Sequence, residues 1–240
     1  MWRCEVKERA IIFSGGMVRA ILEGRKTQTR RVVKWPVSIS DHGVSHSPMV
    51  MRGGIWWKPE EICSYGRPGD RLWVRESFNW SADDELLLGE NHRKCPERAG
   101  WRADNVVWRA DGERQHPEWG TARWRTSIHL PRWASRITLE VVRVRVERVQ
   151  EITPTDAIAE GCVWFGKYDH PIRGGIPSLL EQRTPVQEFA KIWTEINAKR
   201  GWGWEVNPWV WVVEFRKMPT TNGKRIPAGD AVNEWVGGAR

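Results

Sequence analysis

The spacing of apolar residues in the first part of the chain predicts a strand, a helix and a second strand. Residues 10–13 form a short apolar run typical of a buried strand. In residues 17–22 the apolar positions recur at intervals of three and four, which predicts a helix, and Gly24 supplies a left-handed stop. Residues 25–33 contain β-branched residues and alternating polar positions, so we expect an extended segment after this helix.

The later part of the chain repeats this mixture of strand and helix patterns. Strands are predicted at residues 71–76, 136–146 and 208–216. Between the last two, Thr153 and Gly161 mark the cap and the stop of a short helix, and residues 185–199 carry an apolar face at helical spacing. The pattern predicts a chain that mixes strands and helices.

Two stretches interrupt this pattern, and a third follows it. The predicted insertions and tail are residues 34–67, 81–120 and 217–240. The first insertion is rich in Pro, Gly, Ser and His, with an edge strand predicted at 54–57, and the second is polar apart from a strand at 105–109. We expect one domain over residues 10–216 and a flexible C-terminal tail.

Composition narrows the class of protein. The chain has 240 residues, and no apolar run approaches the ~18 residues of a membrane span. Its N-terminus lacks the pattern of a secretory signal, so we expect a soluble, cytoplasmic protein without a membrane partner. The cysteines are widely separated, which predicts reduced thiols and neither a metal site nor a cofactor; they are Cys4, Cys63, Cys95 and Cys162.

Charge and aromatic content point toward a polyanionic partner. The formal net charge is +8, and 18 tryptophans stand against 2 tyrosines. Several indoles neighbour arginines, as at Trp133, where stacking on a base is one role and core packing is another. A basic protein that is merely soluble is the alternative to a nucleic-acid partner.

Residues 24–31 carry the highest density of charged and hydroxyl side chains considered as a candidate site. This segment holds four cations and two threonine hydroxyls directly after the predicted helix stop. Such a group of donors suits a phosphate or a polar base. From spacing alone, a solvated basic loop explains the segment equally well.

The same segment resembles the motif of ASCH domains, in which a helix ends at Gly and a Lys-Thr-x-Thr-x-Arg-like run enters a barrel. Residues 68–74 look like the Gly-Asp strand of that family, residues 138–146 like its central strand, and residues 209–216 like its closing strand. The resemblance implies an α+β fold, a PUA-like mixed β-barrel with flanking helices, here with two long insertions. Residues 13–22 and 200–210 are also similar to the larger ASCH proteins encoded by phages and prophages, so a bacterial host or a phage-infected cell is the expected setting.

The resemblance also implies an activity. Small bacterial ASCH enzymes that hydrolyse N4-acetylcytidine use a Lys, a Thr three residues later and a Glu on the helix after the central strand. Lys26, Thr29 and Glu160 fall on these positions, and Arg31 matches an Arg that would hold the substrate. The further residues that we expect to contact the substrate are Arg25, Arg30, Arg75 and Trp133, the last in a loop or short helix at residues 127–134 near the barrel mouth.

The chemistry of these three residues is that of amide cleavage. Thr29 would be the nucleophile, and Lys26 would take its proton if burial and a neighbouring arginine lower the lysine pKa. Glu160 would shuttle the proton or orient the leaving amine, although a plain helix-end carboxylate is the alternative. Residues three apart on a regular strand face opposite sides, so the backbone between Lys26 and Thr29 must depart from ideal extension.

Three functions therefore stay open on sequence grounds. The first is a nucleoside- or RNA-directed hydrolase, whose partner is a nucleoside, a nucleotide or RNA. The second is a noncatalytic RNA-binding module, which the Arg and Trp content of the insertions would suit. The third is a phage assembly factor. The insertions could reshape the site and change the substrate.

Overall fold

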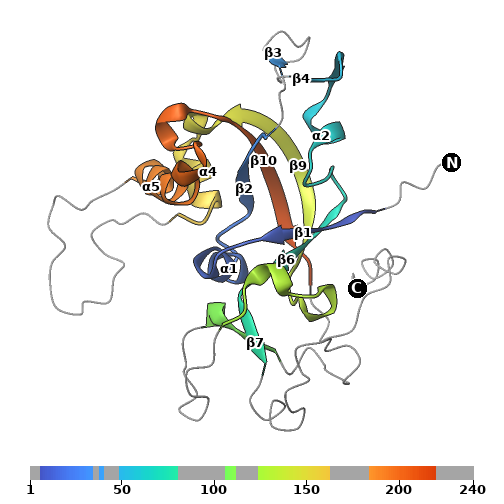
Figure 1. The fold of residues 1–240 in the computed structure, drawn as a ribbon, viewed down its shortest axis with the longest axis vertical. Coiled ribbons are helices and arrows are strands. Elements are labelled where there is room, and N and C mark those ends of the chain that lie inside the picture. Colours follow the sequence, from blue (N-terminus) through green and yellow to red (C-terminus); the bar gives the residue numbers. More distant parts are fainter. Residues whose placement is uncertain are drawn as a thin grey trace, which may run out of the picture.

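The computed structural model describes residues 6–34, 38–40, 49–80, 106–111, 124–162 and 184–219. Its helices and strands form a mixed α+β fold with several sheets, as the sequence pattern predicts (Figure 1). Most of the predicted second insertion and nearly all of the predicted tail lie outside the described residues. Within the described part of the chain, no helix combines the length and apolarity that a membrane span needs.

The main sheet has five strands drawn from both ends of the chain. In spatial order they are β1 (Glu8–Ile12), β6 (Arg71–Arg75), β9 (Thr138–Arg148), β10 (Trp209–Lys217) and β2 (Gln28–Val32). β1 pairs with β6 in parallel, and the other neighbours are antiparallel. Each of these strands was predicted within a few residues of its bounds. Among the described strands the backbone ladder does not close, so β1 and β2 are its two edges.

Strand β10 separates two apolar cores. Its alternate residues Trp211, Val213 and Phe215 face the larger core, which α1 (Gly15–Leu22) also enters. Val210 and Val212 face the other way, toward α4 (Pro154–Ala159) and α5 (Pro185–Asn197). Figure 1 shows these two helices together on one side of β2 and β10. The sheet therefore presents one face of β2 to the larger core and the other to α4.

The chain between α1 and β2 is folded back by hydrogen bonds to the helix end. Gly24 adopts a positive φ of 78°, as the predicted stop requires. The backbone nitrogen of Lys26 donates to the carbonyl of Ala20 at 3.0 Å, and that of Thr27 donates to the carbonyl of Ala159 at 2.8 Å. β2 itself begins at Gln28, although the carbonyl of Thr27 already accepts a hydrogen bond from the backbone nitrogen of Phe215 in β10 at 2.8 Å.

The helix α4 begins and ends where the sequence predicts. Thr153 is its N-cap, and the Thr153 hydroxyl accepts a hydrogen bond from the backbone nitrogen of Asp156 at 3.1 Å. Pro154 is the first helical residue, and Gly161 ends the helix with a φ of 92°. The cap and the stop leave Glu160 as the last residue before the turn.

Smaller elements surround the main sheet. The first predicted insertion contains β3 (Ser38–Ser40), β4 (Met49–Arg52), β5 (Ile55–Trp57) and α2 (Pro59–Ile62). β5 is an edge strand as predicted, whereas β3 and β4 were not predicted. A second pair consists of β7 (Phe78–Trp80) and β8 (Val106–Trp108). The short helices predicted near residues 127–134 are two 3₁₀ turns, Ser127–His129 and Arg132–Ala134.

Candidate functional site

A buried ion pair joins the segment before β2 to the end of α4. Lys26 Nζ donates to Glu160 Oε2 at 2.7 Å and to the Glu160 backbone carbonyl at 2.8 Å. The lysine side chain is fully enclosed, and the glutamate side chain is only 5% exposed. Two of the three residues that the sequence analysis assigned to catalysis are therefore in direct contact, although 134 positions separate them in the chain.

Burial and the neighbouring charges act on the pKa of Lys26 in opposite directions. Burial lowers the pKa of Lys26, and the nearby Arg31 lowers this pKa further, while Glu160 and Cys162 act in the opposite direction. The net direction is downward. A lysine with a lowered pKa can accept a proton at a pH where a solvated lysine cannot.

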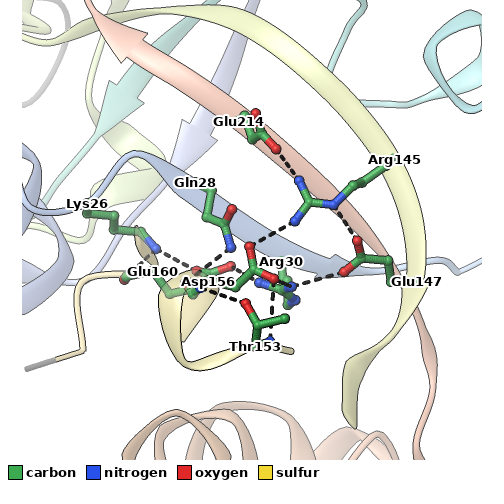
Figure 2. A network of polar contacts seen from close by, with 9 residues as sticks. All are labelled: Lys26, Gln28, Arg30, Arg145, Glu147, Thr153, Asp156, Glu160 and Glu214. Carbon is green, nitrogen blue, oxygen red and sulfur yellow. Dashed lines mark hydrogen bonds and ion pairs between the residues drawn. The ribbon is translucent and has the colours of Figure 1, made fainter. Parts of the chain in front are cut away.

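The second oxygen of Glu160 faces another cation. Arg30 Nη1 lies 3.4 Å from Glu160 Oε1, so the carboxylate is placed between an ammonium and a guanidinium. Arg30 also pairs through Nη2 with Glu147 at 3.0 Å and with Asp156 at 3.1 Å. Figure 2 shows Glu160 in contact with both Lys26 and Arg30.

The network continues along β9 and β10. Arg145 Nη2 donates to Asp156 Oδ1 at 3.0 Å, and Arg145 also pairs with Glu147 and Glu214. Asp156 and Glu147 are thus each shared by Arg30 and Arg145 (Figure 2). The charges of this cluster alternate, which compensates for the burial of Arg30.

Alternate residues before and along β2 engage α4. Gln28 Nε2 donates to the backbone carbonyl of Asp156 at 3.1 Å, between the contacts made by Lys26 and Arg30. Two residues of a strand advance by about 6.6 Å, and four residues of a helix by about 6 Å, so these two spacings nearly coincide. Lys26 and Gln28 can therefore each meet one of Glu160 and Asp156 without distorting either element.

The other face of β2 carries Arg31 and Thr29. Arg31 lies opposite Trp211 and Thr29 opposite Val213, so both face the larger core. Arg31 Nη2 donates to the backbone carbonyl of Ile12 at 2.6 Å.

Phe13 links this face to Lys26. The Arg31 guanidinium lies 5.1 Å from the centre of the Phe13 ring, and Lys26 Nζ lies 5.7 Å from the same centre. Lys26 lies near this ring although its side chain, like those of Gln28 and Arg30, is turned toward α4. This regular alternation gives no sign of the departure from ideal extension that the sequence analysis requires between Lys26 and Thr29.

Thr29 is 2% exposed and shares its face of β2 with Arg31. Burial lowers the pKa of Arg31, but as a guanidinium Arg31 keeps its charge at neutral pH. Thr29 is thus buried on the face of β2 where this cation lies.

The other residues predicted to contact a substrate lie elsewhere. Arg25 is exposed, pairs with Glu23 and donates to the Gly161 carbonyl at 3.1 Å. Arg75 stacks on Trp73 at 4.5 Å, on the face of β6 opposite the residues that enter the larger core.

Trp133 packs against a third apolar cluster, around Phe78 and Leu130. Lys26 and Arg31, by contrast, both lie near the ring of Phe13 in the larger core. The structure thus places Lys26 and Arg31 near one ring, with Glu160 paired to Lys26, and places Trp133 and Arg75 in other surroundings.

Sequence reasoning missed the carboxylates that surround Arg30. Asp156 stands three residues after Thr153, which signals a capping box, but that spacing gives no hint of an ion pair with Arg30. Arg145 and Glu147 sit two residues apart in a strand and so share a face. That pairing was the available signal for a charged cluster beside β9.

Among the side chains that the structure describes, no group of three His, Cys, Asp or Glu residues is arranged to hold a metal ion. The described cysteines, Cys63 and Cys162, are buried and free.

Comparison of the chain with protein-family models, with curated proteins and with solved structures finds no match. The site is therefore interpreted from its own geometry. Its central feature is the enclosed contact between Lys26 and Glu160.

Proposed function

We propose that the protein hydrolyses the amide bond of an N4-acylated cytidine, with Lys26, Thr29 and Glu160 as its catalytic residues. The observation that carries the proposal is the buried ion pair between Lys26 Nζ and Glu160 Oε2, at 2.7 Å. Enclosed ion pairs cost desolvation energy and contribute little to stability, so a functional role is a reasonable explanation for this one. The resemblance of residues 22–31 to the ASCH motif supports the same assignment.

The proposed reaction begins with attack of the Thr29 hydroxyl on the acyl carbonyl carbon. Lys26 takes the hydroxyl proton as the new C–O bond forms, and its lowered pKa favours this role. The C–N bond then breaks, and the proton passes from Lys26, with Glu160 as relay, to the departing amine of cytidine. Water hydrolyses the acyl ester on Thr29, which releases the carboxylic acid and restores the hydroxyl.

Arg31 is the proposed substrate contact on this face of β2. Its Nε is buried and makes no hydrogen bond within the described part of the chain. A guanidinium edge can donate to the oxygen of a base or to a developing oxyanion. Its stacking on Phe13, which Lys26 also approaches, brings such a donor to the region of the proposed base.

We also propose that the five-stranded sheet belongs to the PUA-like class. Its two edge strands approach each other, since Arg31 of β2 reaches the carbonyl of Ile12 in β1. A sheet that curls until its edges are one side chain apart is compatible with a partly open barrel. The helix α1 connects β1 to β2 and packs into the core between them.

The charge distribution favours a hydrolase over a basic binding surface. Many of the described arginines are paired with carboxylates; they include Arg9, Arg30, Arg132, Arg136, Arg145 and Arg216. Paired cations contribute less to counterion release from a nucleic acid than free ones do. The net charge of +8 is therefore a weaker argument for nucleic-acid binding than it is from sequence alone.

The test is the release of cytidine from N4-acetylcytidine, followed by liquid chromatography. Lys26→Met, Thr29→Val and Glu160→Gln should each lower kcat/KM by about 10²-fold or more. The conservative change Thr29→Ser should retain part of the activity because it keeps the hydroxyl. Lys191→Ala, which removes an exposed lysine of α5, is the matched control and should leave the rate unchanged.

A second assay separates the alternatives. If no acylated cytidine, free or within RNA, is turned over, the hydrolase proposal is wrong. Binding of single-stranded RNA that weakens steeply with salt would then identify the noncatalytic module instead. Turnover that survives Thr29→Val would overturn the role of Thr29 while leaving the reaction intact.

A further inference from the structure

Arg30 is enclosed by three structural elements. Its side chain is fully buried, with Glu147 of β9 and Asp156 of α4 on its Nη2 nitrogen. Phe189 of α5 covers the guanidinium, at 5.9 Å from its ring centre. A side chain with these contacts cannot reach a substrate without dismantling the packing of α4 and α5.

The one catalytic group that Arg30 faces is Glu160. Arg30 Nη1 lies 3.4 Å from Glu160 Oε1, while Lys26 holds Oε2 at 2.7 Å. The two carboxylate oxygens are thus assigned to different cations. Rotation of this carboxylate would break both contacts.

We propose that Arg30 is a positioning residue, which holds Glu160 as an oriented carboxylate against Lys26, and that it is not a substrate contact. This inference rests on the proposed hydrolase and deepens it. It adds Arg30, with its anchors Glu147 and Asp156, to the machinery of the site. It also replaces the expectation from the sequence that Arg30 binds the substrate.

The charge of Arg30 also affects how readily Lys26 loses its proton. A cation close to a carboxylate and an ammonium makes both release their protons more readily. Loss of the Arg30 charge should therefore raise the pKa of Lys26. The other charged groups near the pair are Arg31 on β2 and Cys162 after α4, with Glu188 of α5 near Cys162.

The experiment compares wild-type protein with Arg30→Met and Arg30→Lys. The ¹³Cε resonance of Lys26, assigned by its loss in Lys26→Met, is followed from about pH 6 to about pH 11. Arg30→Met should shift the midpoint upward by about one pH unit, and Arg30→Lys, which keeps the charge, by clearly less. The pH–rate profile for N4-acetylcytidine should shift in the same direction.

The outcomes are distinguishable from those of the hydrolase test. A shifted Lys26 midpoint in a protein without hydrolase activity would support the electrostatic coupling and overturn the reaction. An unshifted midpoint in an active enzyme would overturn the role of Arg30 alone. If Arg30→Met does not fold, Arg30→Gln combined with Glu147→Gln removes one charge of each sign; the upward shift is then expected to be smaller, because loss of the more distant carboxylate acts in the opposite direction.

Discussion

Arg31 of β2 donates a hydrogen bond to the backbone carbonyl of Ile12 at the end of β1, with a distance of 2.6 Å from Nη2 to the oxygen. The two residues belong to opposite edges of the five-stranded sheet. A side chain, and not a backbone ladder, therefore connects the edges here. The same guanidinium stacks on Phe13, so one residue ties the sheet, the core and the proposed site together.

Arg31→Met should lower the free energy of unfolding by about 1–2 kcal/mol, because a charged hydrogen bond and a cation–π contact are lost. Arg216→Met is the matched control on β10, where an exposed arginine pairs with Glu140 and should contribute less than ~0.5 kcal/mol. Urea unfolding measures both values. Equal losses in the two variants would show that the link to Ile12 contributes nothing.

Glu160→Met should destabilise the protein by about 3–5 kcal/mol, because it leaves Lys26 buried without its carboxylate. The double variant Lys26→Met, Glu160→Met should recover at least ~1 kcal/mol of that loss, since no uncompensated charge remains. Glu195→Met in the exposed pair with Lys191 is the control and should change little. A double variant less stable than Glu160→Met would contradict this account of the pair.

Gly161→Ala should be more harmful than Gly201→Ala, although both glycines have a positive φ. A methyl group at Gly161 would lie 3.0 Å from Ala20 Cβ and 3.3 Å from Lys26 Cβ, whereas one at Gly201 would meet nothing within 4 Å. The backbone strain of about 1 kcal/mol is common to both, and only Gly161→Ala adds steric overlap next to Lys26. Thermal unfolding should show the larger fall in Tm for Gly161→Ala. Similar falls would mean that the turn relaxes freely.

The described thiols should be protected in the folded protein. Burial raises the pKa of Cys63 to about 11 and that of Cys162 to about 12. In a variant with Cys4→Ser and Cys95→Ser, reaction with Ellman's reagent at mildly alkaline pH should be slow in buffer and fast in urea, because the thiolate is the reactive form. Rapid labelling in buffer would contradict the burial of both thiols.

The same pKa values set a stability trend with pH. Between the unfolded thiol pKa of about 8.5 and the folded values, the folded state retains protons that the unfolded state releases. The free energy of unfolding should therefore fall as pH rises through this window. Cys63→Ala and Cys162→Ala together should flatten the slope; an unchanged slope would assign it to other groups.

Much of the fold could be predicted from the sequence because its signals are local. The cap at Thr153 and the stop at Gly161 fix the ends of α4 through neighbouring residues. Alternation indicates β9, and a continuous run of β-branched and aromatic residues indicates β10. The strand β4 was missed because its three apolar residues form only a short run between Pro48 and the Gly53-Gly54 pair, within a stretch that reads as an insertion. The apolar face predicted for residues 185–199 stops short of Ile196, which is 42% exposed and does not join the second core.

The site was only partly predictable, because its contacts join distant segments. The resemblance to a known motif pointed to Lys26 and Glu160, and these side chains do meet. No periodicity could place Arg30 between Glu147 and Asp156, since that arrangement depends on how α4 packs against β2 and β9. An arginine-rich sequence suggests a binding surface, yet in the folded chain the same arginines can form ion pairs with carboxylates of the protein itself.

The position of β2 has a consequence for how the protein is made. Among the described strands, β2 pairs only with β10, at the opposite end of the described chain. During synthesis, the backbone groups of β2 stay unpaired until β10 has been made. In that interval β2 can pair with strands of other nascent chains. The polar and charged side chains of Gln28, Arg30 and Arg31 make such pairing less favourable. These side chains therefore reduce aggregation during synthesis and also form contacts in the folded protein.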